Sequence, residues 1–175
     1  SQPLWLVERW LERLGYDECA ALCTANNAIA PLNLRVNTLR ANRDGVLHAL
    51  QERGLQARAG TLSPDAILVE NAGSPASWPE WTAGQIIAQD EAAQLVARRA
   101  APQPGQTVID AAAAPGGKTT HLAQLMNNEG WLIACDLSEG RLKLVAENAR
   151  RLGVEIELRA GDFRALAAEL PPADL

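Results

Sequence analysis

The first thirty residues place apolar side chains at helical spacing. Within residues 4–14 these side chains recur every three or four positions, as on the buried face of an amphipathic helix. They are Leu4, Val7, Leu11 and Leu14. Gly15 then stands where a helix ends readily, and residues 17–26 predict a second helix. We therefore expect residues 1–30 to form a helical lead-in.

The next segment alternates between apolar and polar residues, the pattern of a strand with one buried face. The apolar positions are Leu32, Leu34 and Val36, and the polar ones are Asn33, Arg35 and Asn37. Asn42 is a suitable N-cap for a following helix, which would stop near Gly54. Two short strands near 55–59 and 66–70 complete a β-α-β-β pattern. Residues 31–72 are therefore expected to form a small α+β subdomain.

The rest of the chain alternates short apolar runs with helical segments. Residues 73–87 are rich in glycine and proline and predict a linker, and residues 88–100 predict a helix. Three apolar strands are then expected at 107–112, 131–136 and 154–158, separated by helices at 117–126 and 139–152. Because continuous apolar strands joined by helices are typical of a parallel sheet, residues 88–175 predict an α/β domain.

Composition narrows the classes of function. Of the 175 residues 47% are hydrophobic and 21% are charged, as in a globular protein. No apolar run reaches the roughly 18 residues of a membrane span. The first residues lack the pattern of a signal peptide, which favours the cytoplasm. The net charge of -5 gives no support for a large nucleic-acid surface, and residues 1–60 are less acidic than the remainder.

The cysteines predict free thiols. Cys19, Cys23 and Cys135 make an odd number in a chain without a secretory signal, which disfavours disulfides. The only histidines are His48 and His121, far apart in the sequence. We therefore expect no metal site.

Three features follow the predicted parallel strands, where α/β sheets bind their ligands. In the loop 110–119, Gly116 and Gly117 let the backbone approach a ligand, and the next helix points free N–H groups there. Asp136 can accept hydrogen bonds from both hydroxyls of a ribose. Asp162 can accept one from an exocyclic amine, or serve only in a turn. Together they fit an adenosine with a charged tail other than phosphate, because two acids repel phosphate.

Two other ligand classes share part of this pattern. Gly117-Lys118-Thr119 matches the end of a phosphate-binding P-loop, although Ala112 stands where that motif has its first glycine. A dinucleotide fold would use Asp136 in the same way, but its Gly-x-Gly-x-x-Gly run is absent. Lys118 is alternatively a solvated residue of the first helical turn.

Several further residues have a structural and a functional interpretation. Asp110 either contacts a ligand or only orients the loop. Trp78 and Trp81 are expected to pack across the domain boundary rather than stack on bases. Arg35 and Asn37 either bind RNA phosphate or make local hydrogen bonds.

The run Asp110-Ala-Ala-Ala-Ala-Pro-Gly-Gly-Lys-Thr-Thr-His121 resembles the cofactor loop of the Nop/Sun family of RNA cytosine-5 methyltransferases. The resemblance covers essentially the whole chain, through Gln89-Asp90-Glu91-Ala92 and Asp136-Leu-Ser-Glu-Gly-Arg141. The bacterial ribosomal RNA members also resemble this chain at Pro3-Leu-Trp-Leu-Val7, Ala25-Asn26-Asn27 and Leu34-Arg35-Val36-Asn37. The resemblance implies the N-terminal half of a Rossmann-like class I methyltransferase fold, preceded by an RNA-recognition-like subdomain.

The resemblance also implies a cofactor, a substrate and site residues. S-adenosyl-L-methionine would bind with its ribose on Asp136 and its adenine beside Asp162. Its methionine end would be wrapped by Ala112, Ala113, Ala114, Pro115, Gly116, Gly117 and Lys118. The reaction would be methylation of cytosine C5 in RNA, with 16S ribosomal RNA as the expected substrate. The alternative is a non-catalytic module that binds cofactor or RNA.

The chain departs from the family pattern in two places. Ala112 replaces a cysteine of many members, a mild change because that cysteine is not the nucleophile. The family's reacting cysteines lie in Pro-Cys and Thr-Cys segments, and this chain has neither. Since a thiolate must add to C6 before C5 can attack a methyl group, we expect no catalytic residue here and no methylation by this chain alone. We also expect self-association through the open edge of the third parallel strand.

Overall fold

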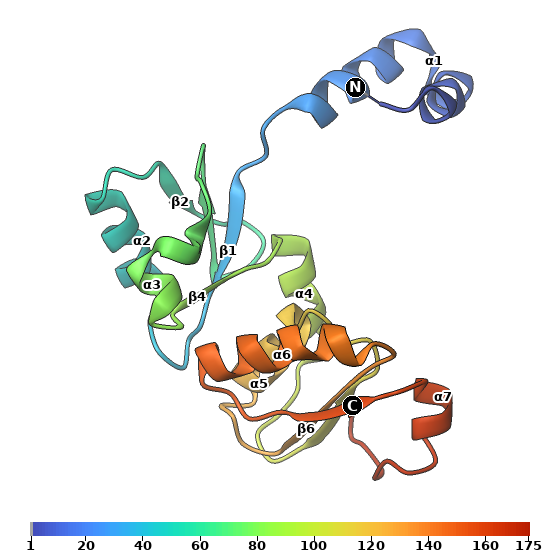
Figure 1. Ribbon diagram of the computed structural model, residues 1–175. Helices are drawn as coiled ribbons and strands as arrows, with labels where there is room; N and C mark the ends of the chain where they lie inside the picture. The colour runs from blue at the N-terminus through green and yellow to red at the C-terminus, as the bar shows by residue number, and fades with distance from the viewer. Residues whose placement is uncertain (1) are drawn as a thin grey trace. The chain divides into compact units, whose positions relative to one another are not determined.

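The computed structural model describes residues 2–175, which divide into a unit ending at Ala30 and a unit from Pro31 to Leu175 (Figure 1). The first unit is the helical segment α1, Leu4–Asn27. Gly15 interrupts it with φ 77° and ψ 177°, a backbone conformation that glycine adopts most readily. The two predicted helices and the break between them are therefore confirmed.

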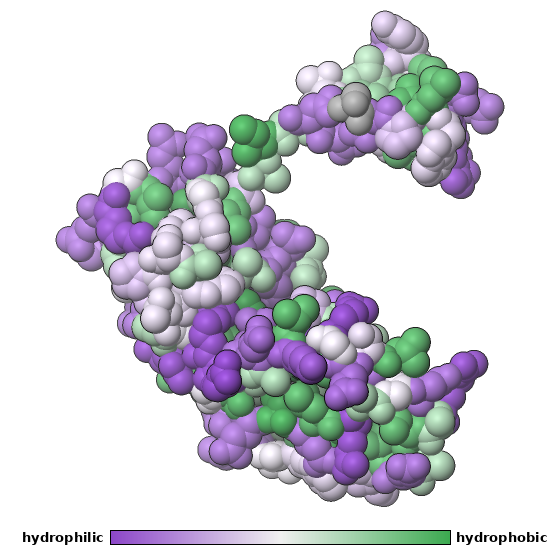
Figure 2. Space-filling model, viewed as in Figure 1, coloured by the Kyte–Doolittle hydropathy of each residue, from purple (hydrophilic) through white to green (hydrophobic). Residues whose placement is uncertain are grey.

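The two stretches of α1 contact each other across this break. Cys19 is buried, and its Sγ lies 3.8 Å from the carbonyl oxygen of Val7. Hydrophobic residues nevertheless lie at the surface of this unit, as Figure 2 shows. Leu4 is 73% exposed and Trp5 is 64% exposed, so the apolar face of α1 is only partly covered within its own unit.

The second unit begins with a four-stranded antiparallel sheet of order β2-β3-β1-β4. Its strands are β1 Leu32–Val36, β2 Ala57–Ala59, β3 Ala66–Val69 and β4 Ile86–Ala88. Helix α2, Arg43–Glu52, is capped by Asn42, whose side chain accepts a hydrogen bond from the Gly45 N–H at 2.8 Å. The predicted β-α-β-β order and this cap are confirmed.

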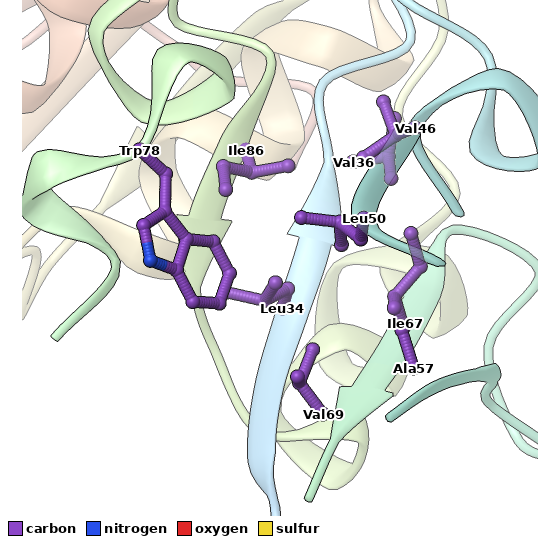
Figure 3. Packing of buried hydrophobic residues seen from close by; sticks show 9 residues of the cluster. All are labelled: Leu34, Val36, Val46, Leu50, Ala57, Ile67, Val69, Trp78 and Ile86. Atoms are coloured by element: carbon purple, nitrogen blue, oxygen red, sulfur yellow. The ribbon is translucent and has the colours of Figure 1, made fainter. Parts of the chain in front are cut away.

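Residues 73–87 hold regular structure where composition predicted an irregular linker. They form a 3₁₀ helix at Pro75–Ser77, the helix α3 at Pro79–Thr82 and most of β4. Strand β4 pairs antiparallel with β1, which its short run of two isoleucines did not reveal. Trp78 enters the hydrophobic core of this sheet (Figure 3). The buried members of that core are Leu34, Val36, Val46, Leu50, Ala57, Ile67, Val69, Trp78 and Ile86.

The remaining residues form a parallel sheet with the strand order β5-β6-β7. The strands are β5 Thr107–Asp110, β6 Trp131–Asp136 and β7 Glu157–Ala160. The helices are α4 Glu91–Ala100, α5 Gly117–Leu125, α6 Glu139–Leu152 and the short α7 Phe163–Leu166. The α/β class predicted from the apolar runs is confirmed, with the third strand starting three residues later than expected.

The two edges of the parallel sheet differ. Strand β7 is one edge, and its last two residues are exposed. Along β5, the Asp174 N–H donates to the Thr107 carbonyl at 2.8 Å and the Ile109 N–H donates to the Leu175 carbonyl at 2.9 Å. The last residues therefore extend the sheet beside β5 and not beside the third strand. Self-association through a sheet edge stays a prediction.

Candidate functional site

The loop after β5 is tied down by the aspartate that ends the strand. Asp110 Oδ1 accepts a hydrogen bond from the Ala112 N–H at 3.2 Å, and Oδ2 accepts one from the Thr119 hydroxyl at 2.7 Å. These two bonds join the beginning of the loop to the first turn of α5. Asp110 therefore orients the loop, which is the structural interpretation of the sequence.

The middle of this loop passes close to α6. Gly116 has φ 100°, and a Cβ atom there would lie 3.2 Å from the Cα of Val145. Both the left-handed backbone and the close approach require glycine. The Asn148 side chain donates to the Pro115 carbonyl at 3.0 Å, so α6 also fixes the loop by a hydrogen bond.

Asp136 lies at the carboxyl end of β6 and faces the same loop. Its Oδ2 accepts from the Ala114 N–H and its Oδ1 from the Ser138 N–H, each at 3.1 Å. These bonds, first that from Ser138, lower the pKa of the Asp136 carboxyl below its usual value. The side chain is therefore an anion at neutral pH. Because a carboxylate can accept about four hydrogen bonds, acceptor positions remain for a ligand.

Asp162 follows β7 and has two roles in the structure. It caps α7, where its Oδ1 accepts from the Arg164 N–H at 3.0 Å. The Arg164 guanidinium pairs with the same carboxylate at 2.5 Å, and this pair lowers the pKa of Asp162. Its side chain is 44% exposed and also borders a pocket, so the turn role and a ligand role are compatible.

One pocket of about 360 Å³ brings the two acids together. It is lined by Ala111, Ala112, Asp136, Leu137, Arg141, Gly161, Asp162, Phe163 and Arg164. Leu137 is 77% exposed, which is unusual for a leucine beside a buried strand. Phe163 is the only phenylalanine of the chain. The pocket thus combines two carboxylates with two apolar side chains, which suits a flat, polar-edged ligand.

The sequence did not single out Leu137, Phe163 or Arg141. Each stands one to five residues after one of the predicted aspartates. That nearness in the sequence is what could have identified them as pocket residues. Among the predicted loop residues, only Ala112 lines the pocket. Within the loop, Ala113 is buried, and Lys118 is exposed at the first turn of α5. The loop from 113 to 118 adjoins the pocket in sequence without lining it.

The four residues for which the sequence allowed either a nucleic-acid contact or a structural role all contact other parts of the protein. They are Arg35, Asn37, Trp78 and Trp81. Arg35 is 0% exposed and Asn37 is 2% exposed, and both make hydrogen bonds within the protein. Of their two interpretations, the structure favours hydrogen bonds within the protein over RNA phosphate binding, because another layer covers the polar face of β1. Trp78 lies in the core of the antiparallel sheet, and the Arg151 guanidinium stacks 3.8 Å above the Trp81 ring. Both tryptophans pack within the protein.

The described residues hold neither a membrane span nor a metal-binding cluster. Between residues 2 and 175, no helix has the length and apolarity to cross a membrane. The same residues contain no cluster of three or more histidine, cysteine, aspartate or glutamate side chains that could hold a metal ion.

Comparison with protein families gives two matches that lie next to each other in the chain. Residues 2–75 match the ferredoxin-like domain of RsmF/B-like methyltransferases. Residues 97–171 match the 16S rRNA methyltransferase RsmB/F model. The boundary between these matches falls near the change from the antiparallel to the parallel sheet.

Individual relatives agree with the family models. Ribosomal RNA small subunit methyltransferase B of Pseudomonas syringae pv. tomato is 42% identical over 95% of this chain. The probable enzyme of the same name from Bacillus subtilis is 36% identical over 89% of it. A crystal structure of a methyltransferase homologue from Pyrococcus horikoshii is 29% identical, with a TM-score of 0.84 over 99% of this chain and 57% of its own. The chain spans 37% and 35% of the length of the two curated relatives.

Proposed function

The chain belongs to the RsmB/F family of rRNA methyltransferases, and from this premise we propose that it carries the S-adenosyl-L-methionine site of an RNA cytosine-5 methyltransferase acting in the cytoplasm. The observation that carries the proposal is the single pocket shared by Asp136, Asp162 and Ala112. Its acids follow neighbouring parallel strands, the usual position of a ligand site in an α/β sheet.

The residues present fit the adenosine part of this cofactor. Asp136 is anionic and keeps free acceptor positions for the two ribose hydroxyls. The side chains of Leu137 and Phe163 would provide apolar contact for the adenine ring, and Asp162 would accept from its exocyclic amine. The P-loop interpretation is disfavoured by its motif, since Ala112 stands where that motif has its first glycine.

The residues of the loop fit the methionine part. The N-terminus of α5 carries free N–H groups and the positive end of the helix dipole, which suit a carboxylate. Lys118 lies exposed in that first turn and adds a positive charge. When bound, S-adenosyl-L-methionine supplies the methyl group that is transferred. Ala112 through Lys118 would hold its methionine end.

We assign the substrate as cytosine C5 in ribosomal RNA from the names of the relatives and the Nop/Sun motifs. The chemistry needs a thiolate that adds to C6 of the base. Cys135 does not fit this role, because it is fully buried and burial raises the pKa of its thiol. We propose that this chain supplies the cofactor site and no nucleophile.

Calorimetry with S-adenosylhomocysteine tests the cofactor site. The 175-residue chain should bind it, and Asp136→Ala should weaken binding by roughly 100-fold, the loss expected for two hydrogen bonds to a charged group. Glu139→Ala is the matched control, since Glu139 is an exposed acid just after Asp136 that does not line the pocket. Tighter binding of ATP with magnesium than of S-adenosylhomocysteine would instead support a P-loop protein.

A further inference from the structure

A buried arginine links the antiparallel sheet to the cofactor loop. Arg35 lies on β1, which pairs with β3 on one side and β4 on the other. Its side chain is fully buried and leaves its own sheet. The three polar groups that accept its hydrogen bonds lie 54, 82 and 85 residues away in the sequence. The contact therefore joins β1 to segments far from it in the sequence.

The contacts of Arg35 converge on the start of α5. Nη1 donates to the Gly117 carbonyl at 2.6 Å and also to the Gln89 side chain. Nη2 donates to the Thr120 hydroxyl at 3.0 Å. That hydroxyl in turn lies 2.7 Å from the Gly116 carbonyl, where it donates a hydrogen bond. The guanidinium therefore fixes the last residues of the loop and the first turn of α5.

The positive charge of Arg35 acts on the N-terminus of α5. Burial lowers the pKa of its guanidinium to about 9, so it remains a cation at neutral pH. Among residues 2–175 no carboxylate forms an ion pair with it within 4 Å. Burying a cation without such a pair lowers the stability of the fold, whereas an apolar side chain at the same position would not carry this desolvation penalty. Its field adds to the positive end of the α5 dipole, which favours an anionic group at that helix terminus.

We propose that Arg35 is a positioning residue for the cofactor loop, holding Gly116, Gly117 and Thr120 in the conformation that receives the methionine end of the ligand. This inference rests on the proposed function of the loop. It makes the antiparallel sheet part of the cofactor site, although none of its residues lines the pocket.

The test compares Arg35 with a neighbour on the same strand. Asn37 is also buried on the continuation of β1, and its amide donates to the Gly84 and Leu152 carbonyls, each at 2.9 Å. One of those bonds reaches the turn before β4 and the other the end of α6, and neither reaches the cofactor loop. Arg35→Met, Arg35→Lys and Asn37→Ala would be made in the 175-residue chain. S-adenosylhomocysteine affinity, melting temperature and hydrogen exchange of residues 113–120 would be measured for each.

Arg35→Met should weaken S-adenosylhomocysteine binding at least about tenfold and speed amide exchange at 116–120, as expected when hydrogen bonds to a charged group are lost. Arg35→Lys should recover part of the affinity because it keeps the charge. Asn37→Ala should lower the melting temperature with affinity changed less than about twofold. An equal loss of affinity in Asn37→Ala would overturn the proposal, since Arg35 would then only stabilise the fold.

Two further outcomes are decisive. If Arg35→Met does not fold, Arg35→Lys takes its place against Asn37→Ala, with the same comparison of affinity and exchange. If the unsubstituted chain fails to bind S-adenosylhomocysteine, the proposed function fails. Hydrogen exchange without ligand then still decides the positioning role, because unchanged exchange at 116–120 in both Arg35 variants would refute it.

Discussion

The two sheets of the second unit use polar side chains in opposite ways. In the antiparallel sheet, Arg35 lies within a strand, and it is buried against other parts of the protein. In the parallel sheet, Asp136 and Asp162 end or follow strands and line a pocket. A strand side chain meets whatever layer packs on that face of the sheet. A side chain at the carboxyl end lies where the chain turns away and leaves an opening.

The sheets also differ in how their cores are closed. The antiparallel sheet packs α2 and Trp78 over one apolar face, and the core residues drawn in Figure 3 come from strands, helix and connection alike. The parallel sheet ends in β7, whose residues are only partly covered. Substitutions in the apolar core of the first should therefore act on stability, whereas those at the rim of the second, like Arg35 through its bonds to the loop, should act on ligand binding.

The largest effect on stability is expected at Leu50, which is 0% exposed in the antiparallel core. Leu50→Ala removes buried methyl groups and leaves a cavity, so the free energy of unfolding should fall by about 2–5 kcal/mol. Urea denaturation measures this. Leu62→Ala is the control, because Leu62 is 60% exposed and should change stability by less than about 0.5 kcal/mol. Similar losses in the two variants would contradict the assignment of the core.

A second prediction concerns how the free energy of unfolding changes with pH through the buried His121. His121 of α5 is fully buried, 3.7 Å from the Asp65 carboxylate and near Arg35 and Arg98. Burial lowers its pKa to about 4. In the unfolded chain it titrates near its ordinary value of about 6.5 and so binds more protons than the folded form between these values. Stability should therefore fall as pH drops from 7 to 4, by up to about 3 kcal/mol.

His121→Gln isolates this contribution, because glutamine does not titrate. Its unfolding free energy should fall less steeply than that of the unsubstituted chain between pH 6.5 and about 5, above the range where carboxyls with a lowered pKa, such as Asp136 and Asp162, also lose their contribution. The Asp65 carboxyl contributes at lower pH. Despite burial, the pKa of Asp65 is held below its usual value by Arg98, which donates a hydrogen bond to it at 2.6 Å, and by His121, which lies 3.7 Å away. The same pH slope in both proteins would show that folding does not lower the pKa of His121.

Local patterns predicted most of this architecture, and tertiary contacts explain the misses. The helix break at Gly15, the Asn42 cap and the parallel pairing of the three later strands follow from residues close in the sequence. Strand β4 exists because β1 pairs with it, and the burial of Arg35 depends on α5 packing nearby. Local sequence patterns predict neither the pairing of β4 with β1 nor the packing of α5 against Arg35.

The same limit applies to the pocket. The two aspartates were predicted because they follow apolar strands, and the pocket lining includes both. Phe163 carries no periodicity and no motif, and Leu137 lies in the run 136–141 without a pattern that marks it as exposed, so their position in the pocket became evident only from the fold.

The smallest effect expected is at the apolar wall of the pocket. Phe163→Ala removes one contact surface for an aromatic ring, and such contacts contribute about 0.5–1.5 kcal/mol. Affinity for S-adenosylhomocysteine should therefore fall by up to roughly tenfold. Stability should change little, because Phe163 begins the short, partly exposed α7. Leu144→Ala is the control, since Leu144 is 46% exposed on α6 and outside the pocket. Calorimetry and thermal melting together separate the effect on affinity from the effect on stability.

A large drop in melting temperature with unchanged affinity would place Phe163 with the core residues. It would contradict the contrast between an antiparallel core that stabilises the fold and a rim of the parallel sheet that binds ligand.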